Sequence, residues 1–144
     1  METRQFATFT VDKLLFGIEV YRVQEVIRYQ DMTAVPLAAR GAAGLINLRG
    51  EVVTAIDMRI RLGLPPRPAD ELPMTGVVRI DDEPVSLLVD TIGDVASVSA
   101  DQFEESPETM TGPGRALVLG AYKLEKQLLL VLDVDRAVDV GAAV

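Results

Sequence analysis

Residues 11–26 read VDKLLFGIEVYRVQEV, and residues 80–95 read IDDEPVSLLVDTIGDV. When Val11 is placed over Ile80, most of the apolar residues of the two stretches coincide, and an aspartate follows in both. In each stretch two apolar segments flank a polar turn, which is the pattern of a β-hairpin. The two stretches therefore predict a chain built from two structurally similar halves, with residues 11–26 superposing on residues 80–95.

The repeat continues towards the C-terminus of each half. Gly44 lies over Gly120, and the strand-like segments that follow both end in an aspartate, Asp57 or Asp133. Each aspartate can cap a short helix, predicted at 57–62 and 133–138. The second copy is longer than the first, and residues 104–115 are the natural place for the insertion.

A proline-rich stretch separates the two halves. Residues 63–73 contain four prolines, which can continue neither a central strand nor a helix. We therefore expect one domain over residues 1–144, with a first subdomain at 5–64, a linker at 65–73 and a second subdomain at 74–140. Short strands spaced by polar turns predict an all-β fold of small barrels or a sandwich.

The composition excludes several functional classes. The chain of 144 residues carries a net charge of −8, which argues against nucleic acid as a partner. Nine acidic and nine basic residues balance up to residue 72, so the whole excess lies in the second half. Without histidine or cysteine, the common catalytic triads and thiolate metal sites are not available. We expect a cytoplasmic protein that is not an enzyme and that uses no metal and no cofactor.

Two groups of carboxylates have a second interpretation. Residues 81–83 are all acidic, but they lack the alternating ligands of a calcium loop, so a solvated hairpin turn is favoured. Asp133 and Asp135 could form an acid/base pair. Helix capping is favoured for Asp133, because Asp57 occupies the same position in the first half.

Two segments carry residues that folding does not obviously require. One is residues 23–27, which follow a strand, and the other is residues 47–50, which form a hairpin tip. Charged Glu25 and Arg49 lie beside apolar residues there, a mixture that is typical of protein interfaces. An ordinary solvated sheet edge is the alternative.

Several motifs, in order and in register, resemble those of the CheW family of chemotaxis coupling proteins. They are Phe16–Val20, Val23–Val26, Gly44–Gly50, Val53–Arg59, Leu88–Val95 and the segment from Leu119 to Asp133. The resemblance covers nearly the whole chain. It implies two five-stranded Src-homology-3-like barrels around a shared apolar core, with short helices, and terminal strands that can cross between the barrels.

The resemblance also implies a set of site residues. The family's receptor-binding groove matches Val23, Glu25 and Arg49, with Val20, Val26 and Leu48 as apolar walls. A kinase or ring contact matches Glu104, Pro107, Glu108 and Thr109, although Thr109 stands where a bulky aromatic residue is expected. Gly44, Gly50 and Gly120 match structural glycines.

The function implied is that of a non-catalytic adaptor. It would couple the cytoplasmic tips of chemoreceptors to the regulatory, CheW-like domain of the sensor histidine kinase CheA, in arrays associated with the membrane but not inserted in it. Further adaptor copies could join the same rings. The alternatives are a coupling protein of a twitching, gliding or other chemosensory pathway and, from another class, a small-molecule-binding β-barrel or an enzyme.

Overall fold

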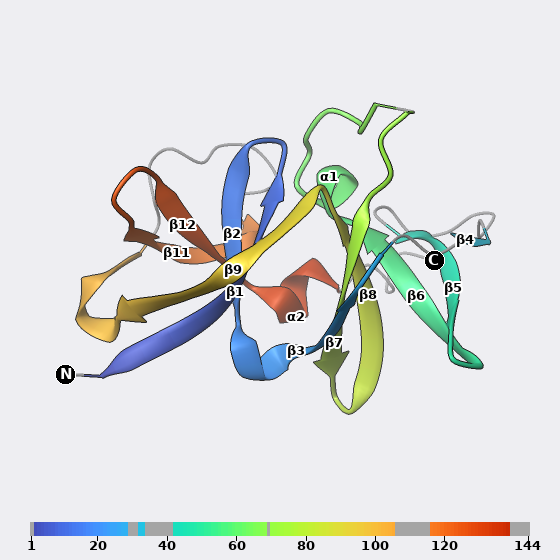
Figure 1. The fold of residues 1–144 in the computed structure, drawn as a ribbon, viewed down its shortest axis with the longest axis horizontal. Helices are drawn as coiled ribbons and strands as arrows, with labels where there is room; N and C mark the ends of the chain where they lie inside the picture. The colour runs from blue at the N-terminus through green and yellow to red at the C-terminus, as the bar shows by residue number, and fades with distance from the viewer. Residues whose placement is uncertain (1, 29–31, 34–41, 69, 106–115, 139–144) are drawn as a thin grey trace.

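The computed structural model describes residues 2–28, 32–33, 42–68, 70–105 and 116–138. Over these residues the fold consists of two antiparallel-rich sheets, each curved into a barrel, that lie side by side (Figure 1). The first sheet has the order β10 (Phe103–Glu105), β11 (Val118–Lys123), β12 (Leu128–Leu132), β2 (Leu14–Glu19), β1 (Thr3–Val11) and β9 (Thr91–Ser99). The second has the order β3 (Val23–Ile27), β7 (Met74–Ile80), β8 (Glu83–Val89), β6 (Glu51–Asp57), β5 (Ala42–Leu48) and β4 (Met32–Thr33). We call them barrel A and barrel B.

The predicted internal repeat is visible in the order of the strands. The first copy runs from β1 to β6 and the helix α1 (Met58–Arg61), and the second from β7 to β12 and the helix α2 (Val134–Ala137). If each strand is replaced by its counterpart in the other copy, the order of barrel A becomes the order of barrel B. The two barrels are therefore topologically equivalent.

The linear division into subdomains at 5–64 and 74–140 does not coincide with the two sheets. The N-terminal hairpin β1–β2 belongs to barrel A, with strands of the second copy, and the hairpin β7–β8 belongs to barrel B, with strands of the first. Each copy thus gives its first hairpin to the other barrel. The exchange places two parallel pairings at the centre of the sheets, β2 with β12 and β6 with β8. Their registers are equivalent under the repeat, since Gly17 faces Val131 and Ser86 faces Ala55.

Each sheet has six strands, whereas five per barrel were predicted. The additional strands are the short β4 and β10, each of which pairs at one edge of its sheet. Both predicted helices are present but shorter than expected. Their first backbone N–H groups are capped as predicted, since Asp57 accepts a hydrogen bond from the Arg59 amide and Asp133 accepts one from the Arg136 amide.

The core consists of three apolar clusters, one inside each barrel and one between the barrels. Barrel A encloses a cluster around Phe6, Tyr122 and Leu129, and barrel B encloses one around Ile46 and Val77. A third, larger cluster lies between the sheets and draws on both: Phe9, Val11, Phe16, Ile18, Ile56, Met58, Val78, Leu87 and Val89 are among its members. This is the shared apolar core. It explains why the central strands β8 and β12 are apolar on both faces, because one face lines a barrel and the other lines the shared core.

The proline-rich linker is fixed to the body by a charged cluster around Asp90, which follows β8. Arg59 of α1 donates three hydrogen bonds to its carboxylate, the shortest at 2.6 Å, and Arg67 of the linker donates one at 3.0 Å. The backbone amide of Asp12, in the β1–β2 turn, donates a further bond at 2.8 Å. A single carboxylate therefore connects the linker, barrel B and the hairpin given to barrel A.

Candidate functional site

Glu25 and Arg49 form an ion pair on the surface of barrel B. Arg49 Nη1 donates to Glu25 Oε1 at 2.9 Å, and Arg49 Nη2 donates to Glu25 Oε2, so the contact is bidentate. The two residues belong to β3 and to the tip of the β5–β6 hairpin, which are not neighbours in the sheet. The hydrogen bond from Arg49 lowers the pKa of Glu25, and the reciprocal bond raises the pKa of Arg49. Two residues that the sequence singled out separately are thus brought together by the fold.

The hairpin tip holds Arg49 away from the core. Arg49 and Gly50 have φ values of 51° and 87°, the left-handed region that two-residue hairpin turns use. Asn47 Oδ1 accepts a hydrogen bond from the Gly50 amide at 2.8 Å, which closes the turn. The Arg49 side chain remains 67% exposed. It can therefore meet a partner without rearrangement of the barrel.

A row of polar side chains continues from this ion pair. Gln24 occupies a bulge of β3, where the pairing with β7 passes from Val23 directly to Glu25. Arg79 Nη1 donates to Gln24 Oε1 at 2.8 Å, and Arg79 Nη2 donates to the carbonyl oxygen of Asp82. Sequence reasoning missed Gln24 and Arg79, because the bulge that aligns them with Glu25 leaves no sequence signal.

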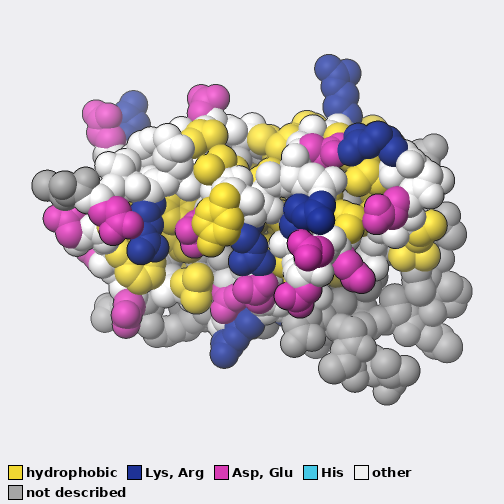
Figure 2. All heavy atoms as spheres, turned by 90° about the horizontal axis from the view of Figure 1, so that it is seen from below, with side chains coloured by type: hydrophobic (Ala, Val, Ile, Leu, Met, Phe, Trp, Pro, Cys, Tyr) yellow, Lys and Arg dark blue, Asp and Glu magenta, His cyan; other side chains and the backbone are white. Residues whose placement is uncertain are grey.

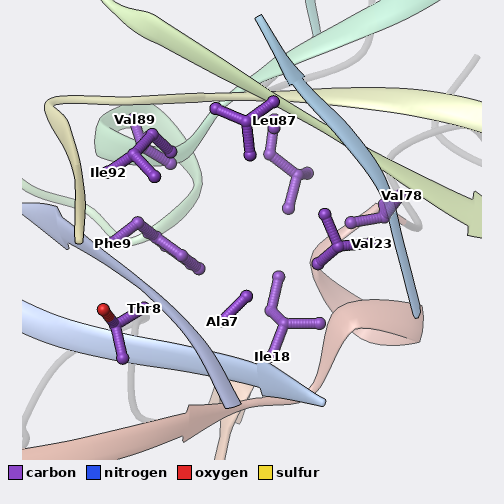
Figure 3. A pocket seen from close by; sticks show the side chains of 11 residues that line it. Ala7, Thr8, Phe9, Ile18, Val23, Val78, Leu87, Val89 and Ile92 are labelled. Atoms are coloured by element: carbon purple, nitrogen blue, oxygen red, sulfur yellow. The ribbon is translucent and has the colours of Figure 1, made fainter. Parts of the chain in front are cut away.

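An apolar pocket lies on the other side of β3. Val23 and Val26 line it together with residues of β1, β2, β7, β8 and Ile92 of β9, and its volume is about 30 Å³. Figure 3 shows Val23 and Ile92 entering the same space from two sides, with Phe9, Ile18 and Leu87 around them. Val26 is 45% exposed, so the apolar surface continues outward from the pocket.

Two of the expected apolar walls, Val20 and Leu48, do not line this pocket. Leu48 is buried inside barrel B, where it packs in the cluster around Ile46. Val20 begins the short 3-10 helix η1 (Val20–Arg22) and is exposed, as is the adjacent Tyr21. The structure thus brings Val23, Val26, Glu25 and Arg49 together, while Leu48 supports the hairpin from within.

The residues expected to contact the kinase or a ring neighbour are only partly described. Glu104 lies on β10 with an exposed side chain, 3.6 Å from Lys123 of β11. Pro107, Glu108 and Thr109 lie outside the described residues.

Gly120 of β11 faces β10, and a Cβ atom there would lie within 2.5 Å of the Glu104 carbonyl oxygen and against the Phe103 ring. Gly120 and its counterpart Gly44 both border irregularities in strand pairing.

Charged side chains of both signs alternate with hydrophobic ones over the face seen in Figure 2. Within the described ranges, no group of three or more acidic side chains could hold a metal ion, and no helix is long and apolar enough to cross a membrane. The turn at Asp81 and Asp82 has positive φ at both residues, like the equivalent turn at Asp12 and Lys13. Two topologically equivalent barrels packed around a shared apolar core define the class of paired Src-homology-3-like folds.

Comparison with known proteins identifies the family. The family model described as CheW-like domain matches residues 5–141. The "Chemotaxis protein CheW" of Treponema pallidum is 28% identical over 139 residues, which cover 94% of this chain and 82% of the relative. That of Bacillus subtilis is 30% identical over 131 residues, with 91% and 84% covered. The crystal structure of the scaffolding protein TtCheW from Thermoanaerobacter tengcongensis superposes with a TM-score of 0.80 at 24% identity, covering 91% of this chain and 89% of that one. The chain belongs to the CheW-like domain family.

Proposed function

We propose that this protein is a non-catalytic chemotaxis adaptor that couples chemoreceptors to the sensor histidine kinase CheA. Family membership supports the general role, because the curated relatives are named chemotaxis proteins and the solved one is named a scaffolding protein. The observation that supports a receptor site is the Glu25–Arg49 ion pair beside the apolar surface of Val23 and Val26.

The geometry suggests how such a site would recognise a partner. An apolar side chain of the receptor would cover Val26 and reach towards the pocket that Val23 lines, where burial of apolar surface supplies the binding energy. Glu25 holds the Arg49 guanidinium in one orientation, so the N–H groups that Glu25 does not use are directed at the partner. The guanidinium next to this apolar patch would contribute to affinity as well as to specificity, because its hydrogen bonds fix the orientation of the partner.

A second surface would bind the kinase or another adaptor. We assign it to the segment that begins at Glu104 and continues through Pro107, Glu108 and Thr109. Glu104 lies on β10 of barrel A, whereas the Glu25–Arg49 pair belongs to barrel B. Two surfaces on different barrels would let one molecule bridge two partners within an array on the cytoplasmic side of the membrane.

The test is the affinity of a soluble cytoplasmic chemoreceptor fragment from the same organism, measured by titration calorimetry. Arg49→Ala is expected to weaken binding by about 10- to 100-fold, since an arginine at an interface centre leaves its partner groups unpaired when removed. Arg49→Lys is expected to restore only part of the affinity, because an ammonium group cannot reproduce the bidentate contact.

Melting curves of the same variants provide the control. Arg49→Ala is expected to unfold at nearly the wild-type temperature, because the side chain is exposed at a turn. Wild-type affinity in Arg49→Ala would remove Arg49 from the receptor site, and a large drop in melting temperature would make its role structural. A pull-down with the wild-type protein, followed by mass spectrometry, would distinguish a chemotaxis pathway from a twitching or gliding one.

A further inference from the structure

The pocket beside the proposed receptor site has two walls that the repeat relates to each other. Val23 and Val26 of β3 correspond to Ile92 and Val95 of β9, and both strands lie at edges of their sheets. Ile92 pairs with Phe9 and Val95 pairs with Ala7, and both Phe9 and Ala7 line the pocket. Val95 is 53% exposed, so β9 presents an apolar strip like that of β3. A segment that docks over the pocket would therefore lie between two similar edges.

The two edges differ in charge. Glu25 on β3 corresponds to Asp94 on β9, but Arg49, which neutralises Glu25, corresponds to Glu125. Asp94 is exposed, and its carboxylate forms no ion pair within the part of the chain that the structure describes. The two lysines near Glu125 in the β11–β12 hairpin form no ion pair with Asp94 in the described structure: Lys123 pairs with Glu104, and Lys126 directly follows Glu125 in the sequence. Asp94, two positions after the pocket-lining Ile92, is thus an acidic residue that no described cation neutralises.

The backbone around Asp94 is fixed. The hydroxyl group of Thr8 donates a hydrogen bond of 2.5 Å to the Asp94 carbonyl oxygen, at the irregularity in the β1–β9 pairing. The backbone of Asp94 is thereby fixed beside Val95, and a partner that covers Val95 would approach the Asp94 carboxylate and displace water from it. Taking an unpaired carboxylate out of water is costly, whereas pairing it with a cation offsets that cost. On the β3 side Arg49 already supplies the cation.

We propose that Asp94 receives a basic side chain, lysine or arginine, of the partner segment that docks over the pocket between β3 and β9. The proposal rests on the proposed function and adds to it the chemistry of the partner: an amphipathic segment with apolar side chains towards Val26 and Val95 and a cation on the β9 side. Arg49 supplies a cation from within this chain, and the partner supplies the equivalent cation from outside. Asp94 is then a specificity-determining residue that selects basic segments.

The test uses the same chemoreceptor cytoplasmic fragment and the whole adaptor. Asp94→Asn is expected to weaken binding roughly tenfold at low salt, and Asp94→Lys to weaken it further, because like charges then meet at the interface. The matched control is Asp70→Asn, an exposed aspartate in the linker that forms no ion pair in the described structure, and it is expected to bind like wild type. Wild-type affinity is expected to fall with added salt more steeply than that of Asp94→Asn.

Reversal of charge on the partner completes the test. Each basic residue of the receptor fragment is replaced by glutamate in turn and titrated against Asp94→Lys. At least one replacement is expected to restore binding to Asp94→Lys while weakening binding to the wild type. If the wild type binds the fragment but both Asp94 variants match it, or if no replacement restores binding to Asp94→Lys, the proposal for Asp94 is overturned and the receptor site stands. If the wild-type protein does not bind the fragment, both are overturned.

Discussion

Replacement of Asp90 by alanine is expected to destabilise the fold by about 3 kcal/mol. The Asp90 carboxylate accepts hydrogen bonds from Arg59, Arg67 and the Asp12 amide, and the side chains of Arg59 and Arg67 are only 10% and 9% exposed. Removing the carboxylate leaves two nearly buried guanidinium groups without their shared counter-ion. Breaking a buried ion pair typically costs about 3–5 kcal/mol.

We expect the lower end of that range because each arginine keeps other acceptors. Arg59 also donates to the carbonyl oxygens of Pro65 and Pro66, and Arg67 lies 3.8 Å from Asp57. For a chain of this size, about 3 kcal/mol corresponds to a melting temperature lowered by roughly 6–12 °C. The linker and the β1–β2 turn should loosen together, since both are held by the same carboxylate.

The assay is urea unfolding followed by circular dichroism, with Asp135→Ala as the matched control. Asp135 lies at the position of α2 that corresponds to Arg59 in α1, and it pairs with Arg22 at 2.7 Å. Its side chain is 67% exposed, so its loss is expected to cost less than about 1 kcal/mol. The argument from burial would be refuted if Asp90→Ala and Asp135→Ala lowered the free energy of unfolding equally, or if Asp90→Ala lowered it by less than about 1 kcal/mol.

The same ion cluster predicts a dependence on pH. Burial by itself would raise the pKa of Asp90, but the hydrogen bonds from Arg59, the Asp12 amide and Arg67 outweigh it, so the pKa is lowered. A carboxylate whose pKa is lower in the folded than in the unfolded state stabilises the fold. The full contribution is present above the unfolded-state pKa, about 3.9, and it is lost as the pH falls through the folded-state pKa. The difference in unfolding free energy between wild type and Asp90→Ala should therefore be constant from about pH 5 to 7 and shrink in stronger acid.

Two further outcomes test the barrel A surface. Charge reversal at Glu104 and Glu108 should weaken binding of the kinase regulatory domain, while a receptor fragment still binds. Parallel titrations with the two partners measure this. Loss of both binding activities in a variant that remains folded would contradict the proposal of separate surfaces. Gly120→Ala should destabilise the fold by about 1–3 kcal/mol, because the added Cβ meets the Phe103 ring and a backbone carbonyl. Gly76→Ala, where a Cβ meets nothing within 4 Å, should change stability by less than about 0.5 kcal/mol in the same urea unfolding experiment.

Features that depend on neighbouring residues were predictable from the sequence. The turn at Asp12 and Lys13, the hairpin tip at Arg49 and the capping role of Asp133 all follow from side chains within a few positions of each other. Strand β12 coincides with an unbroken run of apolar residues, Leu128–Leu132, that is visible in the sequence. Strands β3, β9 and β10 were not predicted as strands, because an edge strand buries little of its surface and so shows a weaker apolar pattern.

The candidate site was predictable only as separate residues. Its members Val23, Glu25 and Arg49 could be selected by family resemblance, but the sequence does not indicate that Glu25 and Arg49 form a bidentate pair. Nor does it indicate the cluster around Asp90, whose partners come from the linker, from α1 and from a hairpin almost eighty positions away. A charged side chain in a sequence carries no signal for the identity of a distant partner.

The sequence by itself determined that this protein is all-β, that it consists of two copies of one strand pattern, and where most of its turns and caps lie. Only the tertiary structure decided that each copy gives its first hairpin to the other barrel, and thereby that β3 and β9 border one apolar pocket. The physical reason is that the alternation of apolar residues specifies which face of a strand is buried but not which strand lies beside it. The neighbour is selected by the total apolar surface that the assembled barrels bury, and that sum is a property of the whole chain.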